Sequence, residues 1–179
     1  MPRRTEDCLT WVQRYVYVQR RDRVLEIGCG PGKLASMIMP RLREGSYTGI
    51  DPSAQAIAAA VRSNQADIAT GRMVFHALDL ANAPLAAASF DKVIAVNVDP
   101  LWMRAGPELS IVRSLMAPAA VLYLVFQLAP RDDSAGLVSR LMPRLHANRL
   151  SISAICSRQT VPTPTLCVEI RGADDEMAP

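Results

Sequence analysis

Three glycines at alternate positions follow a short apolar run near the start of the chain, and this pattern constrains the fold more than any other. Residues 24–35 read Val-Leu-Glu-Ile-Gly-Cys-Gly-Pro-Gly-Lys-Leu-Ala, with a single acid, Glu26, in the apolar part. A buried parallel strand is almost continuously apolar, and glycine permits tight turns that a ligand can approach closely. The periodic segment 34–42 predicts a helix whose first N–H groups face the turn. Strand, turn and helix together are typical of a nucleotide-type cofactor site.

The composition is that of a globular protein with a substantial core. The chain has 179 residues, half of them hydrophobic, and no stretch is apolar for long enough to span a membrane. The opening Met-Pro-Arg-Arg-Thr-Glu-Asp lacks the apolar region of a secretory signal. We therefore expect a cytoplasmic protein with no membrane partner. We expect a single domain over 1–179, with an N-terminal helix or lid at 1–22 and a flexible tail at 173–179.

The charged and metal-binding residue types argue against several other functions. The net charge is only +3 and the arginines are dispersed along the chain, whereas a nucleic-acid binder more often gathers them into one stripe. The four cysteines include no CxxC pair and are accompanied by only two histidines, which is not a zinc pattern. We expect no nucleic-acid partner, no metal site, no disulfide framework and no catalytic thiol.

Strand-like and helix-like segments alternate along the chain. The expected strands cover 23–27, 47–50, 73–78, 90–98, 120–127, 150–157 and 165–171, and the expected helices 5–20, 34–42, 54–66, 107–116 and 134–148. This alternation predicts an α/β fold with a Rossmann-like, doubly wound sheet of seven strands in three αβα layers. We expect a mostly parallel sheet with an antiparallel last strand. We also expect Pro143 to interrupt the last helix.

Polar residues cluster at the carboxyl ends of the first four strands, where open α/β sheets bind ligands. Asp51 lies nineteen residues beyond Gly32, at the end of the second strand, where a carboxylate can accept from both hydroxyls of a ribose. Asp79 ends the third strand and can accept from an exocyclic amine. Alternatively, Asp79 has only a structural role, as an aspartate that stabilises a turn. Asn97 follows the fourth strand.

These motifs resemble those of the class I S-adenosylmethionine-dependent methyltransferases of the small single-domain type. The resembling segments are 26–32, 49–53, 78–80, 90–98 and 115–118. The resemblance implies S-adenosyl-L-methionine as methyl donor and S-adenosyl-L-homocysteine as product. The cofactor site that it implies consists of Glu26, Gly28, Cys29, Gly30, Gly32, Asp51, Pro52, Asp79, Leu80 and Asn97. Ala119 and Ala120 replace two glycines that usually follow Pro118, so we expect this turn to avoid positive φ.

The methyl acceptor is much less constrained than the donor. Asp99-Pro100-Leu101-Trp102 resembles the Asp-Pro-Pro-Trp of amino-group methyltransferases that act on adenine or glutamine, but it lies a few residues late. Otherwise the same residues form a loop at the acceptor pocket. The catalytic candidates are Asp99 and His76, and the substrate-pocket candidates are Tyr15, Asp99 and Trp102. A general base is needed only if the acceptor must lose a proton before attack.

No inserted cap domain or basic appendage is evident, so we expect methyl transfer to a small-molecule acceptor by in-line displacement, mainly through positioning. The short lid is compatible with a homodimer in which a second subunit covers the pocket. Three alternatives stay open: an amino-group methyltransferase acting on a nucleobase or protein side chain, an NAD(P)-dependent oxidoreductase, and an inactive cofactor-binding partner. The oxidoreductase fingerprint is G-x-G-x-x-G, whereas position 33 is lysine in this chain.

Overall fold

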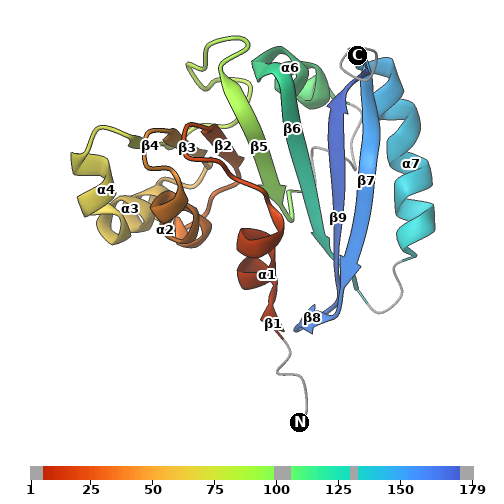
Figure 1. Cartoon of the computed structure of the whole chain (residues 1–179), viewed down its shortest axis with the longest axis horizontal. Coiled ribbons are helices and arrows are strands. Elements are labelled where there is room, and N and C mark those ends of the chain that lie inside the picture. The colour runs from red at the N-terminus through yellow and green to blue at the C-terminus, as the bar shows by residue number, and fades with distance from the viewer. Residues whose placement is uncertain (1–5, 99–105, 130–132, 174–179) are drawn as a thin grey trace.

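The computed structural model describes residues 6–98, 106–129 and 133–173. In chain order the strands are β1 (Glu6–Asp7), β2 (Arg23–Ile27), β3 (Ser46–Ile50), β4 (Met73–His76), β5 (Phe90–Val96), β6 (Met116–Gln127), β7 (Leu150–Arg158), β8 (Thr160–Val161) and β9 (Thr165–Gly172). Seven of them form one sheet in the order β4-β3-β2-β5-β6-β9-β7 (Figure 1). β9 is antiparallel to both neighbours, and the other adjacent strands are parallel. The predicted seven-stranded sheet with an antiparallel last strand is confirmed.

Helices cover both faces of this sheet. They are α1 (Cys8–Tyr15), α2 (Lys33–Ile38), the 3-10 turn η1 (Met39–Arg41), α3 (Ala54–Ser63), α4 (Gln65–Ala69), α6 (Glu108–Leu115) and α7 (Ser134–Ala147). On one face, Leu109 of α6 and Leu141 of α7 belong to a single buried core with the strands. On the other face, Trp11 of α1 and Leu34 of α2 belong to a second core. Among the described helices, none is long and apolar enough to cross a membrane.

The first helix is shorter than the predicted segment 5–20. α1 ends at Tyr15, and Val16 has extended dihedrals. Arg41 of η1 donates through Nη1 to the carbonyl oxygens of Gln13 and Val16, at 2.5 and 3.5 Å. A guanidinium group on the last carbonyls of a helix satisfies acceptors that the helix itself leaves unpaired. The chain beyond Tyr15 therefore runs extended toward β2.

The predicted helix 54–66 breaks at Asn64 into α3 and α4. Asn64 has φ −123° and ψ 22°, which end the first of these helices. Its Nδ2 donates to the carbonyl oxygens of Ala60 at 2.8 Å and of Gly32 at 3.3 Å. Asn64 thus connects the end of α3 to the glycine turn. Local helix propensity does not reveal this contact, because the two residues are 32 positions apart.

The predicted interruption at Pro143 is wrong, because α7 continues through it from Ser134 to Ala147. Proline removes one backbone hydrogen bond from a helix. Leu137, Leu141 and Leu145 recur at four-residue spacing and are all buried in the core on this face of the sheet. We infer that the burial of this stripe outweighs the lost hydrogen bond.

The expectation that the turn at Ala119 avoids positive φ is also wrong, because Ala119 has φ 60°. Phe90 pairs with Met116 and Lys92 with Val121, which leaves four residues of β6 opposite one residue of β5. The extra residues must leave the ladder, as in a β-bulge, and this requires an unusual backbone conformation. Strand register, rather than residue preference, fixes the dihedrals of this turn.

Candidate cofactor site

The glycine turn after β2 has a backbone conformation that favours glycine. Gly28, Gly30 and Gly32 have φ of 71°, 52° and 73°. A Cβ on Gly28 would lie 2.7 Å from Cγ2 of Val98, whereas a Cβ on Gly30 would meet no atom within 4 Å. The backbone of Gly30 therefore faces open space, through which a ligand can approach the turn.

Asp51, at the end of β3, is held against this turn by two hydrogen bonds. Its Oδ2 accepts from the backbone N–H of Gly30 at 2.9 Å, and its Oδ1 accepts from that of Ser53 at 2.8 Å. A carboxylate has about four acceptor positions, so both oxygens can accept further bonds. The carboxylate thus lies where the sequence predicted it, beside the turn, and it can accept from two hydroxyls of one ligand.

Glu26 lies buried in β2, directly before the turn, with an exposed fraction of 3%. The hydroxyl of Tyr47 donates to its Oε2. Burial, and then the negative charge of Asp51, raise the pKa of Glu26 well above its usual range. A cationic group bound at the turn would favour the ionised form of this carboxyl. Binding of such a group and ionisation of Glu26 would therefore be coupled.

Cys29 contributes to the turn through its backbone. Its N–H donates to the carbonyl oxygen of Ile50 at 3.0 Å. Its Sγ packs in the interior, where a Cβ on Gly49 would lie 2.9 Å from it. Burial, followed by the charges of Glu26 and Asp51, raises the pKa of Cys29 to about 12. Nucleophilic cysteines act as thiolates, so this thiol is unsuited to catalysis.

A cavity of about 300 Å³ lies beside the turn at the carboxyl ends of β2 to β5. Four predicted cofactor residues line it, namely Gly28, Pro52, Asp79 and Leu80. The remaining lining residues are Ile27, Ile50, Leu78, Ala81, Val98 and Glu108. A mostly apolar cavity with a few polar groups is the usual form of a small-molecule site. Among the described residues that line this cavity, two are acidic and none is basic.

The two acids reach the cavity from different elements. Oδ1 of Asp79 accepts from the backbone N–H and the Nδ2 of Asn82, at 3.0 and 2.9 Å. Asp79 is therefore a turn aspartate as well as a cavity residue. Glu108 is the first residue of α6, and its Oε2 is buried without a hydrogen-bond partner in the described parts of the chain. Since a buried oxygen without a donor is costly, a ligand with an N–H or O–H group would be favoured here.

Sequence reasoning missed Glu108. It follows a segment outside the described residues, and no local pattern relates it to the glycine turn. Leu78 and Val98 were also missed, although each adjoins a polar residue that was predicted at a strand end. The prediction took polar residues at the carboxyl ends of strands. Including one residue on either side of each would have added both Leu78 and Val98.

The side chain of Asn97 is engaged between two strands. Asn97 has φ 55°, its Nδ2 donates to Oε1 of Gln127 at 2.9 Å, and its Oδ1 accepts from the backbone N–H of Gln127 at 2.8 Å. It is not among the described residues that line the cavity. The structure therefore gives Asn97 a role in fixing the ends of β5 and β6.

The two described candidates for catalysis and acceptor binding, His76 and Tyr15, lie in different elements. His76 lies in β4 and its backbone carbonyl accepts from the N–H of Asp51 at 3.2 Å. Tyr15 lies in α1, where its hydroxyl is bound to another side chain, Glu169. Asp99 and Trp102 lie outside the described residues.

Comparison with known proteins adds to this geometry. The methyltransferase domain family matches residues 24–115, which is more than half of the chain. The chain belongs to this family. The matched part of this methyltransferase domain runs from β2 to the end of α6 and contains the glycine turn, Asp51, Asp79 and Glu108.

The methyltransferase domain is similar to curated relatives over less than half of their length. It is similar to solved structures over most of theirs. An O-methyltransferase of Pyrenophora dematioidea is 38% identical over 74 residues, which cover 41% of this chain and 27% of that protein. The chain spans less than half the length of the curated relatives that it matches. A SAM dependent methyltransferase from Aquifex aeolicus has a TM-score of 0.72 at 13% identity, covering 92% of this chain and 89% of that one. Geranyl diphosphate methyltransferase in complex with SAM has a TM-score of 0.73 at 10% identity, covering 92% and 84%. The domain therefore has the class I methyltransferase fold.

Proposed function

We propose that this chain transfers a methyl group from S-adenosylmethionine to a small-molecule acceptor. The observation that carries the proposal is the cavity at the glycine turn. Its described lining is apolar except for two acids, Asp79 and Glu108, and contains no basic residue. S-adenosylmethionine carries a sulfonium and an ammonium group, and an acidic site favours both. A dinucleotide carries a pyrophosphate instead, which this set of residues would repel.

The residues present fit this cofactor. The open space at Gly30 admits a ligand to the backbone, and Asp51 can accept from the two ribose hydroxyls. Pro52 offers an apolar face to an adenine ring, and Asp79 an acceptor to its amine. Glu26 supplies a carboxyl beneath the turn for the ammonium end. The bound cofactor would supply an electrophilic methyl group with a good leaving group.

In this proposal the chain's own residues act mainly by binding and by excluding water. In-line displacement at an activated methyl group requires the acceptor atom to be held near the methyl carbon. Because the chain holds both reactants in place, the reaction between them becomes effectively unimolecular. The apolar cavity wall excludes the water that would compete with the acceptor. The name of the O-methyltransferase relative supports an oxygen acceptor for this chain as well.

The test is incubation of the full chain with methyl-labelled S-adenosylmethionine and a panel of small phenols, carboxylic acids and amines. We expect label in at least one small molecule, and loss of transfer in Asp51→Ala. Asp67→Ala, an acid in α4, is the matched control and keeps the activity. Label that enters only protein or nucleic acid, with none in small molecules, would contradict the proposed acceptor class.

A further inference from the structure

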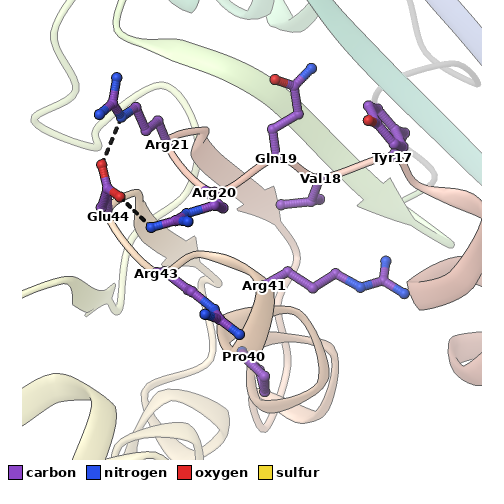
Figure 2. Close-up of a pocket in the computed structure, with 9 residues that line it drawn as sticks. All are labelled: Tyr17, Val18, Gln19, Arg20, Arg21, Pro40, Arg41, Arg43 and Glu44. Carbon is purple, nitrogen blue, oxygen red and sulfur yellow. Dashed lines mark hydrogen bonds and ion pairs between the residues drawn. The ribbon is translucent and has the colours of Figure 1, made fainter.

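A second and larger hollow, of about 990 Å³, lies at the opposite end of β2 from the glycine turn (Figure 2). Four arginines line it, Arg20 and Arg21 from the segment before β2 and Arg41 and Arg43 from the segment before β3. Because a strand rises about 3.3 Å per residue, the five residues of β2 separate the hollow from the cofactor turn by about 15 Å. We call this hollow the arginine groove.

Two backbone segments form its walls, and they are bonded to each other. The carbonyl oxygen of Arg20 accepts from the N–H groups of Glu44 and Gly45, at 2.9 and 2.8 Å. A Cβ on Gly45 would lie 2.2 Å from the carbonyl oxygen of Asp22, so only glycine allows the segments to come this close. The arginines are therefore presented from a fixed backbone.

The groove carries more positive than negative charge. Glu44 is the only acid among the described residues that line it. Arg20 and Arg21 share this one carboxylate, at 2.6 and 2.7 Å, and their side chains are 65% and 84% exposed (Figure 2). One carboxylate neutralises one of the two guanidinium charges, and exposed ion pairs of this kind contribute little. Both arginines therefore retain free N–H donors.

The other two arginines add charge, and no carboxylate in the described part of the chain forms an ion pair with either of them. Arg41 is held by the carbonyl oxygens at the end of α1, which fix its position but carry no full charge. The side chain of Arg43 has no hydrogen-bond or ion-pair partner in the described ranges, and Arg43 is exposed. Four arginines and one carboxylate residue thus line this hollow in its described part.

We propose that the arginine groove binds a ligand that carries several phosphate groups along a chain. Guanidinium groups bind phosphate through paired N–H donors, and their charge persists at every physiological pH. A ligand with a single negative charge would offset only one of the positive charges that exceed the charge of Glu44 in the described lining. A chain of phosphate groups places successive charges along the groove, and the hollow has the size of a small-molecule site. The sequence alone indicated dispersed arginines, but the pairing of β2 with β3 brings two pairs of them together.

Two sources offer this chemistry, a free polyphosphate and the phosphodiester backbone of single-stranded RNA. The probes are inorganic tripolyphosphate and a short oligouridylate, added separately to the full chain at low ionic strength and followed by calorimetry. Neither probe contains adenine, so neither competes for an adenosine pocket. Saturable binding of tripolyphosphate alone identifies a free polyphosphate as the source, and tighter binding of oligouridylate identifies the RNA backbone.

Three variants distinguish binding in the arginine groove from non-specific electrostatic attraction to a basic protein. Arg43→Gln should weaken binding about tenfold, which corresponds to the loss of one charge-assisted hydrogen bond. Glu44→Gln should tighten binding, because it frees Arg20 and Arg21. Arg62→Gln, at an exposed arginine in the last turn of α3, removes the same charge elsewhere and should leave affinity unchanged.

The proposal is overturned if neither probe binds saturably, if Arg43→Gln and Arg62→Gln weaken binding equally, or if Glu44→Gln weakens it. None of these outcomes depends on methyl transfer. Binding of S-adenosylhomocysteine, measured on the same variants, should be unaffected in all of them.

Discussion

The hydroxyl of Tyr15 in α1 donates to Oε1 of Glu169 in β9 at 2.7 Å, and so joins two elements 154 residues apart. Burial, and then this bond and the charge of Glu169, raise the pKa of Tyr15, so the phenol stays a neutral donor. Trp11 stacks on the Tyr15 ring with 4.9 Å between centroids. Tyr15 was a candidate for contact with the acceptor, but its hydroxyl is used to fasten α1 to the sheet.

Tyr15→Phe should lower the free energy of unfolding by about 1 kcal/mol, because it leaves a partly buried carboxylate without its donor. Tyr17→Phe is the control, since Tyr17 is 70% exposed and should tolerate the change. Chemical denaturation of both variants measures the difference. Equal stability of the two variants would show that the bond to Glu169 contributes nothing to the attachment of α1.

Gly30→Ala and Gly71→Ala form a matched pair for the glycine turn. Both glycines have positive φ, 52° and 74°, and a Cβ on either would meet no atom within 4 Å. Each substitution should therefore cost about 1 kcal/mol of stability from backbone strain alone. We expect only Gly30→Ala to abolish binding of S-adenosylhomocysteine, because its methyl group would occupy the space proposed for the ligand. Equal binding by the two variants would place the ligand elsewhere.

The sequence predicted the seven strands of the main sheet well, because each is either mostly apolar or alternates apolar and polar residues. It also predicted the position of Asp51, because parallel strands end at the same edge of a sheet. Helix ends were predicted less well, since Asn64 and Arg41 act through partners far along the chain. Glu108 could not be predicted, because it belongs to a helix rather than to a strand end and no local pattern relates it to the cavity.

Glu108→Gln should leave the free energy of unfolding within about 0.5 kcal/mol of wild type, because it keeps the shape of the side chain and no described residue donates to the Oε2 that it alters. The same change should weaken binding of S-adenosylmethionine several-fold, because it removes a negative charge from the cavity in which this cationic ligand is proposed to bind. Thermal unfolding and calorimetry measure the two effects separately. Unchanged affinity would show that Glu108 does not face the cofactor.

Glu26→Gln tests the pKa of the buried acid. The folded protein holds the pKa of Glu26 above its usual value, so this residue contributes stability that is present below pH 4.5 and is lost as the pH rises through the raised pKa. We expect Glu26→Gln to gain stability relative to wild type as the pH rises from 4 to 8. In Glu44→Gln the trend should have the opposite sign, because Arg21 and Arg20 lower the pKa of Glu44. Denaturation across this pH range measures how the stability of each variant, relative to wild type, changes with pH. A change of the same sign in both variants would contradict the raised pKa of Glu26 or the lowered pKa of Glu44.

The most direct measurement is calorimetric titration of the full chain with S-adenosylhomocysteine and, separately, with NAD. We predict saturable binding of S-adenosylhomocysteine in the micromolar range and none of NAD. Asp51→Ala should weaken the binding by about 2 kcal/mol, which is roughly thirtyfold, because hydrogen bonds to a charged group are lost. Binding of NAD without binding of S-adenosylhomocysteine would contradict the assignment of the glycine turn and of the cavity beside it.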